Sequence, residues 1–430
     1  MRWISGVVLA VLAGAFSAGQ ILSGALQQPG FRVQTDPIAV LQERLDRGEI
    51  ELEHSPERGY LDSLLEVLEV PSSSQTFVFS KTSLQSPLID PDAPRALYFN
   101  DDVYVGFVRG GPVLELGSID PVHGTVFYTL DQEETDAPTF QAEGIRCISC
   151  HLPSRPDIPV PRLMVMSVIP NENGEAVGTD VSLITDASPL ARRWGGWFVT
   201  GTGGNIVHRG NSVIGGDRGP GWRLGEEPHL AELDGRFDVS PYLRNDSDIV
   251  ALLLLVHQSQ IHNLIGDAAY AVRAAAEEED ARERFLRTAD PAYSRQTLNR
   301  VAEVAEPLVR GLLFAGAVSL EDTVAAPSEF AAEFSATGPR DSRGRSLRDL
   351  DLDGRLLRYP LSYLVYSDQF DQLPDLALGY VYRRLREVLG GEDSSGEFGH
   401  LSAADRRAIL EILTETKREF RELAGVSVSP

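Results

Sequence analysis

The feature that most constrains this chain is the run Cys147-Ile148-Ser149-Cys150-His151, which contains the only two cysteines among 430 residues. Covalent haem c needs this C-x-x-C-H order, because two thiols three residues apart reach the vinyl groups on one porphyrin edge and the adjoining imidazole reaches the iron. Such a run arises by chance in about one in ten thousand chains of this composition. The motif therefore predicts one covalent haem c, attached at Cys147 and Cys150, with His151 as an axial ligand.

Three other roles of a C-x-x-C pair stay open as weaker interpretations: a zinc half-site, a redox-active dithiol and a structural disulfide. A zinc site would need a second Cys or His pair, and the sequence contains no further C-x-x-C and no H-x-x-x-H. A thioredoxin-type dithiol begins a helix after a strand and has no need of a histidine directly behind it. The histidine at position 151 therefore favours haem.

The charge of the chain limits its partners. Its formal net charge is −24, which argues against binding to nucleic acid or to an anionic membrane surface through bulk electrostatics. A basic redox partner protein would suit this charge. The length is enough for two or three domains and a substantial core.

The N-terminal residues 1–26 have the pattern of an export signal. Arg2 is followed by an apolar run and then by small residues suitable for a signal peptidase. The same run could stay attached as an N-terminal membrane anchor, since it approaches spanning length. In either case we expect the domain to be periplasmic or secreted, which agrees with the attachment of haem c after translocation.

Hydrophobic periodicity divides the rest of the chain into two regions. Residues 33–236 show short stretches of period two separated by turn residues, and residues 237–430 show mainly helical spacing. The predicted strands are 76–80, 96–99, 103–107, 113–116, 125–130 and 163–169; the main predicted helices are 37–45, 60–68, 248–273, 293–313, 373–389 and 402–423. Asp36 and Ser402 are expected helix caps. We therefore predict an α+β fold: a β-rich N-terminal half carrying the C-x-x-C-H site, with a helical C-terminal half packed on it.

Four stretches together resemble a known group of proteins. They are the C-x-x-C-H motif, residues 95–107, Arg193-Trp-Gly-Gly-Trp-Phe-Val-Thr-Gly-Thr202 and His257-Gln-Ser-Gln-Ile-His-Asn263. The chain is similar to exported bacterial cytochrome c-domain, or haem c-binding, proteins of poorly characterised function. The resemblance implies thioether bonds at the two cysteines, an axial histidine at 151, and no particular reaction. Members of that group carry His-Met-Gly-Asn where this chain has His208-Arg-Gly-Asn211, so a methionine ligand at that point is absent.

The sixth ligand of the iron could be Met, His, water or nothing. Met164 and Met166 lie two apart on an apolar stretch, so we expect both to point into the core and not to bind iron. His257 continues the apolar stripe of its helix, and His208 lies in a glycine-rich loop that could approach a haem face. We expect one of these two histidines above the iron. His262 is expected to act as a hydrogen-bonding residue.

Two further motifs are weak. Asp349-Leu-Asp-Leu-Asp-Gly354 matches the first half of a calcium loop, but position twelve is Pro360 where a bidentate Glu is needed, so calcium is not expected. The run Gly201-Thr-Gly-Gly204 lacks the third glycine of a dinucleotide-binding fingerprint and no βαβ unit surrounds it. Neither motif changes the prediction of haem.

Two functions follow from a single haem c. The first is an exported monohaem cytochrome that transfers single electrons, in which both axial positions are filled. The alternative is a haem-dependent oxidoreductase of peroxidase or oxygenase type, in which the sixth position is open or labile. The size of the chain favours the enzyme, because electron transfer alone needs fewer residues. A haem-bearing sensor or assembly component is a third class.

Overall fold

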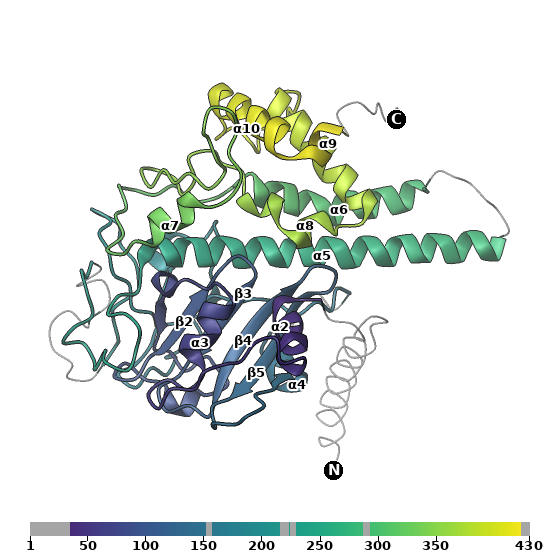
Figure 1. Cartoon of the computed structure of the whole chain (residues 1–430). Coiled ribbons are helices and arrows are strands. Elements are labelled where there is room, and N and C mark those ends of the chain that lie inside the picture. Colours follow the sequence, from purple (N-terminus) through teal and green to yellow (C-terminus); the bar gives the residue numbers. More distant parts are fainter. Residues whose placement is uncertain (1–34, 152–156, 216–222, 224–228, 287–292, 423–430) are drawn as a thin grey trace, which may run out of the picture.

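The N-terminal half is built on a single six-stranded antiparallel sheet in which every strand pairs with its neighbours in sequence (Figure 1). The computed structural model describes residues 35–151, 157–215, 223, 229–286 and 293–422. The strands are β1 (Thr76–Val78), β2 (Arg95–Phe99), β3 (Val103–Phe107), β4 (Val113–Asp120), β5 (Gly124–Asp131) and β6 (Phe140–Ala142). The expected β-rich half is confirmed, and the expected N-terminal signal or anchor, residues 1–26, lies outside the described residues.

The turns of this sheet follow from side chains that bond their own backbone. Asn100 Oδ1 accepts from the N–H groups of Asp102 and Val103, which closes the turn between β2 and β3. Asp120 Oδ1 does the same for the turn into β5, where Gly124 has a φ of +84° that glycine adopts without strain. These tight turns leave one register for each pair of strands.

Two short helices cover one face of the sheet, α2 (Pro37–Asp46) and α3 (Leu61–Val67) (Figure 1). As predicted, Asp36 caps α2, and its Oδ1 accepts from the N–H groups of Ile38 and Ala39. Its second oxygen accepts from the hydroxyl of Tyr128 on β5 at 2.7 Å. One buried carboxylate therefore both begins the helix and docks it on the sheet.

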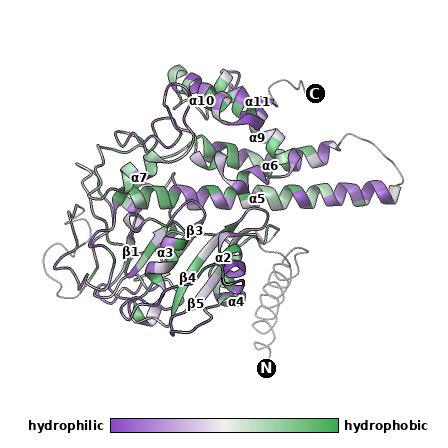
Figure 2. Ribbon diagram, viewed as in Figure 1, coloured by the Kyte–Doolittle hydropathy of each residue, from purple (hydrophilic) through white to green (hydrophobic). Residues whose placement is uncertain are grey.

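The long helix α5 (Ile249–Leu286) crosses the opposite face of the sheet (Figure 1). It is long and apolar enough to cross a membrane, yet 89% of its most apolar stretch is buried within the fold, which is the pattern of a core helix. It continues thirteen residues beyond the predicted end at Arg273, and this last part is largely hydrophilic (Figure 2). Three successive alanines favour a helix there, and Ala275 and Glu279 are still buried.

The helices that follow α5 in the sequence lie on its side away from the sheet (Figure 1). They are α6 (Arg295–Leu312), α7 (Phe330–Ala336), α8 (Asp368–Asp371), α9 (Asp375–Gly390), α10 (Ala403–Thr416) and α11 (Arg418–Glu422). Ser402 and Asp405 form the expected capping box at the start of α10. One hydrophobic cluster joins sheet residues such as Phe127 to helix residues as distant as Phe420. The α+β prediction, with the helical half packed on the sheet, is confirmed.

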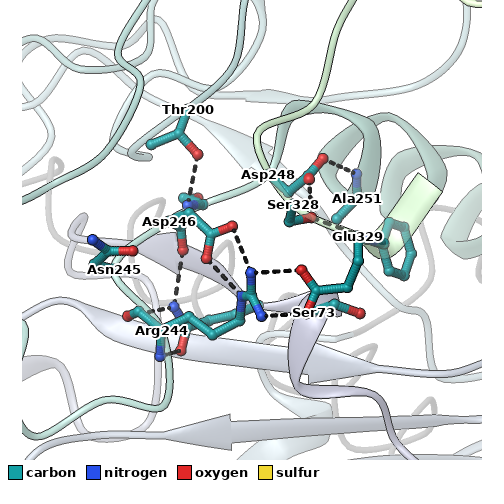
Figure 3. A network of polar contacts seen from close by, with 12 residues as sticks. Ser73, Thr200, Arg244, Asn245, Asp246, Asp248, Ala251, Ser328 and Glu329 are labelled. Atoms are coloured by element: carbon teal, nitrogen blue, oxygen red, sulfur yellow. Dashed lines mark hydrogen bonds and ion pairs between the residues drawn. The ribbon is translucent and has the colours of Figure 1, made fainter. Parts of the chain in front are cut away.

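A network of charges fixes the first turn of α5 (Figure 3). Asp248 Oδ1 caps the helix by accepting from the N–H groups of Val250 and Ala251, and Ser328 donates to its other oxygen. Beside it, Arg244 pairs with Asp246 at 2.8 Å and with Glu329 at 2.8 Å. The helix thereby starts at a defined point relative to the sheet, which sets the position of every residue along it.

Candidate haem-attachment site

The C-x-x-C-H motif lies on the short helix α4 (Ile145–Ile148) and the turn that continues it. The carbonyl oxygen of Cys147 accepts from the N–H groups of Cys150 at 3.1 Å and His151 at 3.0 Å. Residues three and four apart in a helical turn share a face, so both thiols and the imidazole are presented on one side. Neither cysteine is in a disulfide; Cys147 is half-buried and Cys150 is exposed.

The imidazole of His151 is held by the segment that follows the motif. Its Nδ1–H donates to the backbone carbonyl of Arg162 at 2.6 Å, and Arg162 N–H donates to the carbonyl of His151 at 2.9 Å. The ring also packs against Phe127 of β5, with centroids 4.2 Å apart. Among the described residues, none hydrogen-bonds Nε2. This nitrogen is therefore the one available for a metal, in the tautomer that an Nδ1–H···O=C bond selects.

The pKa shifts of His151 and Cys147 distinguish metal binding from thiol–disulfide exchange. Burial lowers the pKa of His151, with the Arg162 carbonyl acting in the opposite direction, so the ring is neutral at neutral pH, as a metal ligand must be. Burial raises the pKa of the Cys147 thiol to about 11, with Glu143 and Glu115 adding to the effect. A redox-active dithiol needs a lowered thiol pKa. The environment of Cys147 is therefore unlike that of a thiol–disulfide exchange site.

Residues 162–163, which position His151, are themselves bound to side chains of helix α5. The side-chain amide of Asn263 makes two hydrogen bonds to the backbone of Leu163, accepting from its N–H at 3.0 Å and donating to its carbonyl at 2.8 Å. One helical turn further on, Asp267 pairs with the guanidinium of Arg162. Asn263 appears within one of the quoted sequence stretches, but the roles of these residues were not predicted. They are about a hundred positions apart in sequence, and no local pattern signals such a contact.

Met164 and Met166 are placed differently from the expectation. The segment is extended, and its predicted strand survives only as β7 (Met166–Ser167), paired with β8 (Ser182–Leu183). Leu163 and Val165 point into the core, whereas the two methionines share the other face and are half-buried. The prediction that they lie in the core is wrong, because the alternating pattern puts Leu163 and Val165 in the buried cluster and the methionines on the opposite face. That neither sulfur binds iron stays a prediction.

His257 is buried on α5, as its apolar stripe predicts, but both of its ring nitrogens are engaged. Nδ1–H donates to Asp186 Oδ2 at 2.7 Å, and Nε2 is hydrogen-bonded to Ser362 Oγ at 2.8 Å. The ring stacks on Phe314 with centroids 4.3 Å apart. It lies ten residues before Asp267, about 15 Å along the helix axis. To bind iron, His257 would have to give up one of these two hydrogen bonds.

The other two histidines are also buried in polar or aromatic surroundings. His262, expected to hydrogen-bond, is bonded through Nδ1 to Gln369 at 2.7 Å and through Nε2 to the carbonyl of Asp101 at 2.8 Å. His208 accepts from the N–H of Gly210 at 3.0 Å and lies edge-on to Trp194. No contact between described residues joins either His208 or His257 to His151. That one of these two histidines lies above the iron stays a prediction.

The acidic run 349–354 forms ion pairs instead of a converging set of oxygens. Asp349 pairs with Arg340 at 3.0 Å, and Asp351 pairs with Arg355 at 3.0 Å. Across the described part of the chain, no group of three or more His, Cys, Asp or Glu side chains is placed to hold a metal ion. Comparison of the chain with protein-family models, with curated proteins and with solved structures found no match.

Proposed function

We propose that this protein is an exported monohaem c-type cytochrome that transfers single electrons. The observation that carries the proposal is the C-x-x-C-H motif, with its two free thiols and the His151 imidazole on one helical face. The fit extends beyond the sequence pattern, because His151 is neutral, held through Nδ1, and has Nε2 available. These are the features that haem attachment requires of the protein.

Each residue of the motif has a distinct part in this proposal. Cys147 and Cys150 would tether the porphyrin, and His151 Nε2 would bind the iron; the haem, when bound, supplies one-electron chemistry. Donation from Nδ1–H to the Arg162 carbonyl fixes the ring orientation and makes the imidazole a stronger ligand. Phe127 packs on the ring and excludes water from that side. The net charge of −24 suits a basic redox partner.

A test of attachment compares three proteins expressed with a signal peptide and a cytochrome c maturation system. A denaturing gel stained for haem should label the wild-type chain and Ser149→Ala, because Ser149 is an exposed spacer. The double variant Cys147→Ala/Cys150→Ala should give no labelled band. If the double variant retains covalent haem, or the wild type never acquires it, the proposal fails.

A second candidate function is that of a haem-dependent oxidoreductase. The hydrogen bonds of the His257 ring favour it. His257, one of the two expected distal ligands, uses both ring nitrogens in hydrogen bonds. Unless His208 binds, an iron at His151 would keep its sixth position open or labile. A substrate-sized oxidant could then reach the metal. High-spin ferric haem and rapid binding of CO to the ferrous protein would support the enzyme. A low-spin spectrum that ignores CO and cyanide would support the carrier.

A further inference from the structure

A second candidate site lies apart from the cysteines, in a cavity of about 610 Å³. This volume is in the range of pockets that enclose small organic molecules. The walls come from segments distant in sequence: the loop before Arg193, helix α5, the loop after α6, and the loops around residues 354–360 and 396–400. The apolar part of the wall is formed by Leu253, Phe314, Ala317, Val318, Leu320, Leu356, Leu357 and Pro360.

A buried guanidinium is part of this wall. Arg193 is only 3% exposed. Its Nε donates to the carbonyl of Ser188 and its Nη2 to the carbonyl of Asp186, both at 2.8 Å. Within the described part of the chain, Nη1 makes no hydrogen bond. Because Arg193 lines the cavity, this nitrogen is placed to meet an acceptor on a bound molecule.

A buried carboxylate lies beside the guanidinium. Asp186 lines the same cavity and is 8% exposed. Its Oδ2 accepts from His257 Nδ1 at 2.7 Å, and His257 is in turn bonded to Ser362. Among described residues, nothing donates to Oδ1. The chain from Ser362 through His257 holds this carboxylate in one orientation before any ligand arrives, which lowers the entropy cost of binding.

We propose that this cavity binds a small zwitterion with an apolar body, of the α-amino acid class. The carboxylate of such a molecule would accept from Arg193 Nη1, its ammonium group would donate to Asp186 Oδ1, and its side chain would lie against the apolar wall. The buried charges of Arg193 and Asp186 balance one another. The other two charged residues of the wall, Arg355 and Glu397, have ion-pair partners of their own. A head group with both charges therefore adds no net charge to the site. A ligand carrying one charge would leave an uncompensated charge in a medium of low dielectric constant.

The test is titration calorimetry on the full-length haem-loaded protein with L-phenylalanine or L-leucine. Two analogues remove one charge each: 3-phenylpropionate lacks the ammonium group and 2-phenylethylamine lacks the carboxylate. Loss of one charge-assisted contact should weaken binding about ten- to a hundredfold. Binding of either analogue as tightly as phenylalanine would overturn the zwitterion class, and no binding by any of these probes would overturn the site.

Substitutions in the cavity wall test whether the ligand binds in this cavity. Arg193→Gln and Asp186→Asn each remove one of these contacts and should weaken binding by the same factor, but both residues also support the fold. Ala317→Trp fills the cavity from a half-buried wall position and should abolish binding while the thermal unfolding midpoint stays close to that of the wild type. Arg192→Gln is the matched control, because Arg192 is adjacent, exposed and outside the cavity. Unweakened binding in Ala317→Trp would place the ligand elsewhere and contradict the proposal.

Discussion

The Nδ1 atom of His151 lies 2.6 Å from the backbone carbonyl oxygen of Arg162, and the side chain of Arg162 pairs with Asp267 on α5. The proposed iron ligand is thus connected to the core helix through a single intervening residue. Asn263, one turn earlier on α5, binds the next backbone unit of the same segment. The orientation of the imidazole therefore depends on α5, which is buried along residues 249–259.

We expect Asn263→Ala to lower the free energy of unfolding by about 1–3 kcal/mol. The reason is that the variant leaves the N–H and carbonyl of Leu163 buried without their partner. Asn173→Ala is the control, since Asn173 is exposed, and it should change stability by less than about 0.5 kcal/mol. Urea unfolding followed by circular dichroism measures both. Equal stability of the two variants would show that the two hydrogen bonds between Asn263 and the Leu163 backbone do not stabilise the fold.

Asp267→Asn should also destabilise the protein, by about 1–3 kcal/mol, because it leaves the largely buried guanidinium of Arg162 without its counter-charge. The control is Glu49→Gln, which breaks the exposed pair with Arg47 and should have almost no effect. Thermal unfolding of the haem-loaded proteins measures the difference. A loss as small as that of the control would contradict the assigned role of Asp267.

For His257→Ala we expect an unchanged haem absorption spectrum and a stability lower by about 2–4 kcal/mol. The ring is bonded at both nitrogens and stacked on Phe314, so its removal leaves a cavity and two buried polar groups without partners. Glu134→Ala, at an exposed position, is the control for stability. A change from a low-spin to a high-spin spectrum in His257→Ala would instead identify His257 as the distal ligand.

Much of the fold could be predicted from local pattern. The strands around 103–107 and 125–130 are rich in β-branched and aromatic residues, and turn residues such as Asn100 separate them, although both of their faces are buried. Asp36 and Ser402 were identifiable as caps because a capping side chain bonds backbone only two or three residues away. The C-x-x-C-H motif was identifiable for the same reason, since its geometry is contained within one helical turn.

The parts that could not be predicted depend on contacts between distant residues. The hydrogen bond between Asn263 and Leu163 joins residues 100 positions apart, and the one between His257 and Asp186 joins residues 71 positions apart. An apolar stripe places His257 inside the fold, but it does not say which partners occupy its nitrogens. The face chosen by Met164 was predicted wrongly because alternation defines two faces and does not say which of them meets a helix.

The last prediction concerns Asp102, at the turn between β2 and β3. Burial raises the pKa of this carboxyl to about 6 from its ordinary value of 3.8, against the opposing effect of His262 and with additional repulsion from Asp101 and Asp368. The folded protein therefore holds a proton on Asp102 at pH values where the unfolded chain has lost it. Proton binding by Asp102 therefore stabilises the folded protein. This contribution to the free energy of unfolding is complete below about pH 4 and is lost as the pH rises through about 6.

The variant Asp102→Asn carries a neutral amide at every pH, so it does not lose stability as the pH rises through about 6. The difference in unfolding free energy between the variant and the wild type should therefore increase in favour of the variant, by about 1–3 kcal/mol between pH 4 and pH 7. Asp136→Asn, at an exposed position, should show no such pH-dependent difference. Urea unfolding at several pH values measures both curves. A constant difference between Asp102→Asn and wild type over this range would mean that the carboxyl titrates alike in the folded and unfolded chains, contrary to its buried position beside two other acids.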